Sequence, residues 1–427
     1  MPTSPCSTLI FGGTGFLGGL VAAALLSEER RRLLLPVRAP GDPAACLARI
    51  RLGLGDRAVA EHLIEELMRL VTVVALPPIE RLSDLDQFAA AMGVNEIIHC
   101  AGCVNYFDEA GLESANVDLT AKLLEAARSW GVERFIYLST AYCSGYRSER
   151  IPERLHPEPA PGDEPTAYTR TKRVAEWLIA DSGIPFVIIR PSIVIGDSRS
   201  GTYRGKNYGL YQLWRAVEGL LCHEYAPIWY CVAPQVPANL VHQDSFQSGF
   251  IGIYRSVPPD AIVHLVSDHE KSPTMRELCW MWADVYCPRE VHCYARYEDV
   301  PLRSLPARHR RFLQVVAKNL EIPNHRWEFE ATQLGRLRAA GLPFTDTTLE
   351  TVARCQRRYI AGSKRIQAHM ERHAGRPGGP PRLVEIAIPG ETRLFHRVPL
   401  STGMSAAVGV GSRIPAVVAH PRRGVAP

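Results

Sequence analysis

The chain has 427 residues, of which 46% are apolar and 22% charged, as in globular proteins with one large or two ordinary domains. This composition excludes a small secreted scaffold held by disulfides, so the eleven scattered cysteines are expected to be reduced thiols in a cytoplasmic protein. The net charge of +5 divides into −8 over the first 302 residues and +13 over residues 303–427. This basic C-terminal third suits an acidic partner such as a carrier protein, coenzyme A or nucleic acid, but a solvated basic face without a partner explains it equally well.

The first element is an uncharged, mostly apolar run from Thr8 to Leu26, long enough to suggest a membrane or signal segment. No basic segment precedes it, and glycines interrupt its centre. A strand, a tight turn and a helix better explain the run Gly12-Gly13-Thr14-Gly15-Phe16-Leu17-Gly18. The glycines permit the turn and let backbone amides approach a pyrophosphate at the start of the helix. The run therefore predicts a dinucleotide site, and no other segment is long and uncharged enough to span a membrane.

The second predicted strand, Leu33–Val37, is followed at once by Arg38. An acidic residue at this place would bind the ribose hydroxyls of NAD, whereas an arginine suits the 2′-phosphate of NADP. Arg49 is a second candidate for the same contact. The sequence therefore predicts NADPH as the cofactor.

Short β-rich runs alternate with helical patterns through the first two hundred residues. This alternation predicts a doubly wound α/β fold, a parallel Rossmann sheet with right-handed crossovers and helices on both faces. The proline-rich and charged stretch Glu149–Glu164 is predicted to be a loop. The expected strands are Thr8–Gly12, Leu33–Val37, Val71–Ala75, Glu96–Cys100, Arg134–Ser139 and Phe186–Arg190, and the expected helices are Phe16–Ser27, Ala58–Leu70, Asn116–Trp130 and Ala167–Ser182.

Tyr168 precedes Lys172 by four residues, which places both side chains on one face of a helix. A nearby ammonium stabilises phenolate, so we expect Lys172 to lower the pKa of Tyr168. Such a tyrosine can exchange a proton with a carbonyl oxygen while a nicotinamide exchanges hydride with the carbon. The chain has only six lysines against 43 arginines, so a position that needs only a positive charge would more often hold arginine. Lys172 is therefore difficult to explain as an ordinary surface charge.

The pattern becomes irregular and aromatic after Gly196. The tyrosines and tryptophans between 203 and 230 could line a substrate cavity or form the core of a small cap domain. A strand at Ile262–Val266 and a helix from Thr274 to Tyr286 follow. We therefore expect a cofactor-binding domain over 1–200 and a smaller substrate-binding region over 201–370, interleaved with late sheet elements. A flexible, Gly/Pro-rich tail is expected over 374–427.

The glycine turn, the Tyr168–Lys172 pair and two further motifs, Ser139-Thr140-Ala141-Tyr142 and Arg190-Pro191-Ser192, resemble the extended short-chain dehydrogenase/reductases. Within that superfamily the chain is similar to the thioester reductase and fatty acyl-CoA reductase branch. The resemblance covers roughly residues 8–201, is thin to about 365 and is absent in the tail. The segments that carry it are Val37-Arg38-Ala39, His99-Cys100-Ala101-Gly102, Asn116-Val117, and residues 135–142 and 190–201.

The resemblance implies roles that composition and spacing do not assign. Thr140 takes the position of the catalytic Ser/Thr, beside Tyr168 as the proton donor and Lys172 as the ribose-binding lysine. Asn116 takes the position of an asparagine counted with the catalytic residues, although a simple helix cap explains it equally well. The cofactor-binding positions implied outside the glycine turn are Cys100, Ala101, Gly102, Lys172, Arg190, Pro191 and Ser192, the last equally a plain loop hydroxyl.

Two further features bear on the site. The lone pair Cys100 and Cys103 favours small residues beside a cofactor over a metal or redox site, since no second pair accompanies it. Ala75-Leu76-Pro77-Pro78 stands where the family usually has Gly-Asp contacting adenine, so adenine binding must differ.

The resemblance implies an NADPH-dependent reductase that converts an acyl thioester, carried on coenzyme A or an acyl carrier protein, to an aldehyde or alcohol. One alternative is an extended reductase acting on a ketone, secondary alcohol or sugar nucleotide through the same residues. Another is an NADP-binding module that has lost its chemistry. We expect no metal ion and no nucleic-acid partner.

Overall fold

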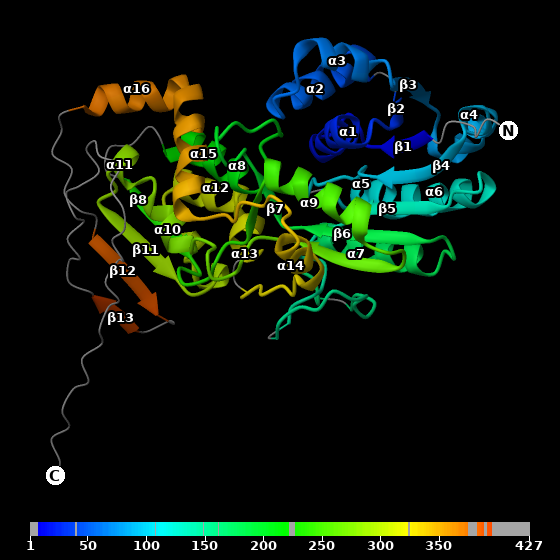
Figure 1. The fold of residues 1–427 in the computed structure, drawn as a ribbon. Helices are drawn as coiled ribbons and strands as arrows, with labels where there is room; N and C mark the ends of the chain where they lie inside the picture. Colours follow the sequence, from blue (N-terminus) through cyan, green and yellow to red (C-terminus); the bar gives the residue numbers. More distant parts are fainter. Residues whose placement is uncertain are drawn as a thin grey trace.

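In the computed structural model, the chain folds around a seven-stranded parallel sheet next to a smaller, second sheet (Figure 1). The structure describes residues 7–38, 41–106, 108–147, 149–160, 162–221, 227–322, 325–374, 382–387 and 391–394.

The large sheet has the strand order β10-β6-β5-β4-β1-β2-β3, and every neighbouring pair in it is parallel. This order places β1 and β4 at the centre, where the direction of winding reverses and open α/β sheets bind ligands. The predicted doubly wound Rossmann fold is confirmed. The strands are β1 (Ser7–Phe11), β2 (Arg32–Arg38), β3 (Val71–Leu76), β4 (Val94–His99), β5 (Arg134–Leu138), β6 (Phe186–Pro191) and β10 (Ala261–Leu265).

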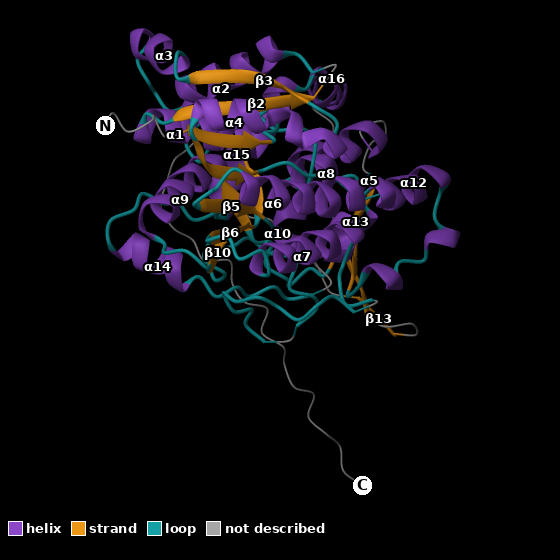
Figure 2. Cartoon of the chain, turned by 90° about the vertical axis from the view of Figure 1, so that its right-hand side faces the viewer, coloured by secondary structure: helices purple, strands orange, loops and turns teal. Residues whose placement is uncertain are grey.

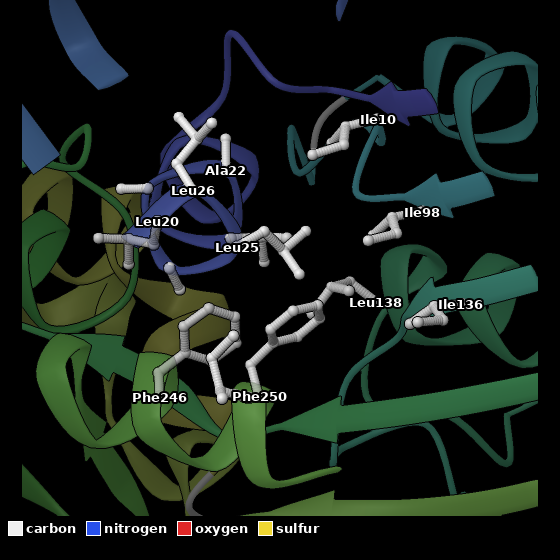
Figure 3. Packing of buried hydrophobic residues seen from close by; sticks show 14 of the residues in the cluster. Ile10, Leu20, Ala22, Leu25, Leu26, Ile98, Ile136, Leu138, Phe246 and Phe250 are labelled. Atoms are coloured by element: carbon white, nitrogen blue, oxygen red, sulfur yellow. The ribbon is translucent and has the colours of Figure 1, made fainter. Parts of the chain in front are cut away.

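Helices cover both faces of the large sheet because each strand is apolar on both sides. On one face, α1 and α9 lie side by side against the sheet, and Leu25 of α1 lies near Phe246 and Phe250 of α9 (Figure 3). That side holds α1 (Phe16–Glu29), α2 (Pro43–Asp56), α3 (Glu61–Met68) and α9 (Gln243–Ser256), and the other holds α4 (Asp86–Met92), α6 (Leu119–Ser129) and α7 (Ala167–Ala180). The short helix α5 (Glu109–Glu113) precedes α6.

The second sheet has the order β13-β12-β11-β8 and lies at the opposite end of the molecule from the N-terminus (Figures 1 and 2). Its strands are β8 (Ile228–Val232), β11 (Glu290–Tyr294), β12 (Arg382–Ala387) and β13 (Glu391–Leu394). The remaining elements are β7 (Ile193–Ile195), β9 (Leu240–His242), α8 (Leu210–Ala216), α10 (Met275–Trp280), α11 (Ala283–Tyr286), α12 (Ala307–Val315), α13 (Ala317–Glu321), α14 (Thr332–Ala339), α15 (Leu349–Gly362) and α16 (Lys364–His373).

Most aromatic residues of the irregular region form the core of this second part. Tyr211, Trp214, Trp229 and Tyr230 are all buried in one apolar cluster, which leaves a cavity of only about 30 Å³. Of the two alternatives for these four residues, the core of a small domain is therefore the one observed. Tyr208 is exposed and lies outside that cluster.

Several observed elements differ from the predicted ones. The helix α2 was not predicted, and the expected helix Thr274–Tyr286 is two short helices separated at Met281 and Trp282. The expected flexible tail contains β12 and β13, which extend the second sheet from β11; the residues after 394 lie outside the described part of the chain.

Candidate active site

The glycine turn joins β1 to α1 at the centre of the sheet. Gly12 has φ +82°, and a Cβ added there would lie 2.5 Å from the backbone nitrogen of Ala101. A Cβ at Gly18 would lie 2.2 Å from the carbonyl oxygen of Gly12. Only glycine fits these positions, because Gly12 is pressed against the backbone that follows β4 and Gly18 against the backbone of Gly12 and Gly13.

The start of α1 is suited to an anionic ligand. Its N-cap is Gly15, which has no side chain to accept a hydrogen bond from the first amides. The first backbone amides of this 14-residue helix can therefore donate to a ligand. Thr14 and Gly15 are exposed, while Phe16 and Leu17 are half-buried. The residues of the turn therefore fit the pyrophosphate of a dinucleotide.

The two arginines predicted to bind the 2′-phosphate lie on consecutive elements, Arg38 at the end of β2 and Arg49 in α2. Arg38 is exposed and ends β2, the strand next to β1. The Cδ of Arg49 lies 3.0 Å from the position of a Cβ added at Gly19, so its methylene groups cover the first turn of α1. Their contact with a 2′-phosphate stays a prediction.

The helix α7 carries Tyr168 in its first turn and Lys172 one turn later. The helix begins with a capping box in which Thr166 Oγ1 accepts from the Thr169 amide and Thr169 Oγ1 accepts from the Thr166 amide. Lys172 is 4% exposed and donates to the Leu138 carbonyl oxygen at 2.7 Å. The cap fixes the start of α7, and this bond fixes the Lys172 side chain beside the end of β5.

The electrostatics at this pair differ from the prediction. Burial raises the pKa of Tyr168, and the neighbouring Tyr106, whose ring lies edge-on at 6.0 Å, raises it further. Burial lowers the pKa of Lys172 to about 8. The expectation that Lys172 lowers the pKa of Tyr168 is wrong for this structure, because the ammonium points to the Leu138 carbonyl and lies 4.3 Å over the ring of Tyr137.

Thr140 lies two residues after β5 and is 7% exposed. The backbone around it is held in place because the Ala141 amide donates to the Pro191 carbonyl oxygen at 2.9 Å. Thr140 and the bond made by Lys172 thus both lie at the carboxyl end of β5, and Tyr168 is one helical turn from Lys172. A hydroxyl, a phenol and an ammonium gathered at this edge can together bind and protonate a carbonyl oxygen.

Asn116 lies in a π-helical turn, Ser114–Asp118, that precedes α6. Its Oδ1 accepts from the Cys103 amide at 2.9 Å, and its Nδ2 donates to Thr171 Oγ1 at 2.9 Å. A Cβ added at Gly102 would lie 2.8 Å from Asn116 Oδ1 and 3.7 Å from Lys172 Nζ. Asn116 is therefore not a simple helix cap, because it holds the segment after β4 against α7. Its place among the catalytic residues stays a prediction.

Cys100 and Ala101 follow β4 and lie against Gly12 of the glycine turn, whereas Gly102 lies beside Asn116 and Lys172. The Cys100 amide donates to the Phe11 carbonyl oxygen at 2.8 Å. Burial raises the pKa of the Cys100 thiol to about 12, and both Cys100 and Cys103 are free cysteines. The contacts of these residues with a cofactor stay predictions.

Arg190 differs from the predicted cofactor contact. It is fully buried, and its Nε and Nη2 donate to the two carboxylate oxygens of Glu176 at 2.9 and 2.6 Å. Burial and the charge of Arg190 lower the pKa of His156 to about 2, so this neutral imidazole accepts a third bond from Arg190 at 2.9 Å. The guanidinium therefore binds Glu176 of α7, and a contact of this residue with a cofactor stays a prediction.

Pro191 and Ser192 follow Arg190 at the end of β6. The Ser192 amide donates to the Leu265 carbonyl oxygen, and its buried Oγ has no hydrogen-bond partner among the described residues. Their predicted contacts with a cofactor stay predictions.

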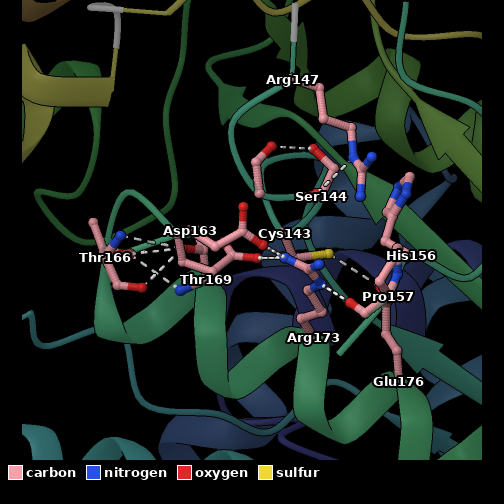
Figure 4. A network of polar contacts seen from close by, with 12 residues as sticks. Cys143, Ser144, Arg147, His156, Pro157, Asp163, Thr166, Thr169, Arg173 and Glu176 are labelled. Atoms are coloured by element: carbon pink, nitrogen blue, oxygen red, sulfur yellow. Dashed lines mark hydrogen bonds and ion pairs between the residues drawn. The ribbon is translucent and has the colours of Figure 1, made fainter. Parts of the chain in front are cut away.

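Sequence reasoning missed a polar network behind α7 (Figure 4). Arg173 donates to Asp163 and Glu164 at 2.7 and 2.8 Å and to the Pro157 carbonyl oxygen at 2.6 Å. Glu176 also accepts from the Cys143 thiol at 3.2 Å. The available signal was spacing, since Glu176 follows Lys172 by four residues and must share its helix face.

The model of the male sterility protein family, an NAD-binding family, matches residues 10–243, more than half of the chain. The chain belongs to this family. The isonitrile lipopeptide synthase of Streptomyces coeruleorubidus is 30% identical over 294 residues, 66% of this chain and 19% of that protein. Fatty acyl-CoA reductase 1 of Xenopus laevis is 26% identical over 224 residues, 44% of this chain and 43% of that protein. The chain thus spans less than half the length of these relatives.

The fold is similar to that of the terminal R domain from the myxalamid PKS-NRPS pathway, with a TM-score of 0.67 and 18% identity over 85% of this chain and 92% of that one. With the family match, this confirms the predicted extended short-chain dehydrogenase/reductase type, its thioester reductase and fatty acyl-CoA reductase branch, and a nicotinamide cofactor. Within the described ranges, no helix combines the length and apolar character that crossing a membrane requires.

Proposed function

We propose that this chain is an NADPH-dependent reductase of acyl thioesters, carried on coenzyme A or on an acyl carrier protein. The observation that carries the proposal is that Lys172 donates to the last residue of β5, that Thr140 follows this strand by two residues, and that Tyr168 lies one helical turn from Lys172. The names of the relatives support the substrate class, since one is a fatty acyl-CoA reductase and another a lipopeptide synthase. Arg38 at the end of β2 supports NADPH over NADH.

The bound cofactor supplies hydride to the thioester carbonyl carbon. Tyr168 donates its proton to the carbonyl oxygen, and the burial that raises its pKa keeps it in the protonated form that a donor needs. The Thr140 hydroxyl donates a hydrogen bond to the same oxygen as charge develops on it. The resulting hemithioacetal breaks its C–S bond, which leaves an aldehyde and releases the thiol. A second reduction would give the alcohol.

The test is oxidation of NADPH by the purified chain with a panel of acyl-CoA thioesters, with products identified by mass spectrometry. Aldehyde or alcohol together with free coenzyme A supports the proposal. If no acyl-CoA is consumed, the same acyl groups are offered on an acyl carrier protein, and NADH replaces NADPH in parallel. Reduction of ketones or sugar nucleotides without release of any thiol would replace this proposal with the alternative substrate class.

A further inference from the structure

The segment between β7 and α8, residues 197–209, is here called the strap. Its base is rigid. Ser198 binds the Asp244 carboxylate of α9 through its amide at 2.9 Å and its hydroxyl at 2.6 Å. Asp197 Oδ1 accepts from the amides of Arg199 and Ser200 at 3.1 and 2.7 Å. The strap is therefore fixed to α9 where it leaves β7.

The middle of the strap reaches the start of α1 through one aromatic side chain. Tyr203 stacks on Tyr211 with ring centroids 3.7 Å apart and meets Phe16 edge-on at 4.9 Å. The Tyr203 hydroxyl donates to the Lys206 carbonyl oxygen at 2.9 Å. A Cβ added at Gly205 would lie 2.3 Å from the Tyr203 ring, so the strap can wrap around this ring only with glycine there.

A second contact holds the strap to the cofactor-binding part. Arg204 Nε and Nη2 donate to the two carboxylate oxygens of Asp56 at 2.8 and 2.7 Å. Asp56 is the last residue of α2, and the loop before α8 comes up to this end of α2 in Figure 1. The strap thus touches Phe16, the first residue after the glycine turn, and the helix that packs on α1.

We propose that the strap belongs to the cofactor site and retains the dinucleotide, with Tyr203 and Arg204 as the positioning residues. The inference rests on the proposed function, which places a pyrophosphate at the start of α1. The exposed Thr14 and Gly15 form the open side of that position, and the strap borders it from the second part of the chain. A nicotinamide dinucleotide then leaves when the Arg204–Asp56 pair and the Tyr203–Phe16 contact open.

The experiment measures release of NADPH without any substrate. Bound NADPH is followed by energy transfer from tryptophan and displaced with excess NADP in a stopped-flow instrument. Arg204→Ala is expected to speed release about threefold to fivefold, since an exposed pair contributes up to about 1 kcal/mol, a factor of about five. Tyr203→Ala is expected to speed release by a similar or larger factor, because it removes an aromatic contact.

Two matched variants complete the design. Arg51 also lies on α2 and forms an exposed ion pair with Glu65, so Arg51→Ala should leave the release rate unchanged. The charge exchange Arg204→Asp with Asp56→Arg should return the rate to within twofold of the original. If the unaltered chain binds NADPH but Arg204→Ala and Tyr203→Ala release it at the original rate, the strap proposal is overturned alone. If the unaltered chain binds neither NADPH nor NADH, the proposed function falls and the strap with it.

Discussion

Lys172 should make the stability of the chain depend on pH in a way that a single substitution removes. Burial lowers the pKa of Lys172 from 10.5 to about 8. One pKa unit corresponds to about 1.4 kcal/mol, so holding the charge in the folded chain costs about 3 kcal/mol relative to the unfolded chain. Below pH 8 this cost is present in full. Between pH 8 and 10.5 the unfolded chain still holds a proton that the folded chain has lost, so the free energy of unfolding rises with pH.

Lys172→Met removes the titrating group and tests this reasoning. At pH 7 the variant avoids the cost of about 3 kcal/mol but loses the bond to the Leu138 carbonyl oxygen, so we expect a net gain of about 1–2 kcal/mol. As pH rises from 8 to 10.5, the original chain should gain about 3 kcal/mol relative to the variant.

The assay is urea unfolding of both proteins without cofactor at pH 7, 8, 9 and 10, read by tryptophan fluorescence. Other groups that titrate in this range cancel in the difference between the two proteins. Lys122→Met is the control, because Lys122 is exposed and bonded only to Glu125 among the described residues. A constant difference between the original chain and Lys172→Met across this pH range would refute the argument from burial.

Tyr168→Phe should leave NADPH affinity nearly unchanged and lower turnover at least about 100-fold, since the proton donor is lost. Tyr146→Phe is the control, because Tyr146 is exposed. Retained turnover in Tyr168→Phe would reject the donor role. Arg38→Asp should shift preference from NADPH towards NADH in equilibrium binding, and an unmoved preference would place the 2′-phosphate contact elsewhere. Gly18→Ala should weaken binding of the nicotinamide dinucleotide and lower the free energy of unfolding by about 1–3 kcal/mol, because the added Cβ meets the Gly12 carbonyl oxygen. Gly55→Ala is the control: its added Cβ has nothing within 4 Å, so binding and thermal unfolding should both stay unchanged.

The sequence predicted the large sheet because its strands are short apolar runs separated by helices, a pattern that each βαβ unit shows locally. The second sheet could not be predicted in the same way. Its strands β8, β11 and β12 pair across 50 residues or more, and pairing at that distance leaves no local signal. The helix α2 was missed since Gly53 and Gly55 near its end resemble a turn.

The candidate site shows the same division between local and distant causes. The spacing of Tyr168 and Lys172 predicted a shared helix face, and the glycine run predicted a turn that the structure contains. The direction of the Lys172 ammonium depends on a carbonyl oxygen at the end of β5, 34 residues earlier, and spacing says nothing of it. Arg190 was assigned to the cofactor from its motif, whereas its burial against Glu176 depends on how α7 packs on β6.

The pairing of β12 with β11 changes what the C-terminal stretch means for the rest of the fold. A chain shortened after Ala374 would lose β12 and β13, and β11 would become the edge of a sheet. An uncovered edge presents unpaired backbone groups to other chains and favours their association. The Gly/Pro-rich stretch that looks dispensable in the sequence therefore contains the strands that keep β11 an interior strand, a point for anyone choosing where to end this protein for expression.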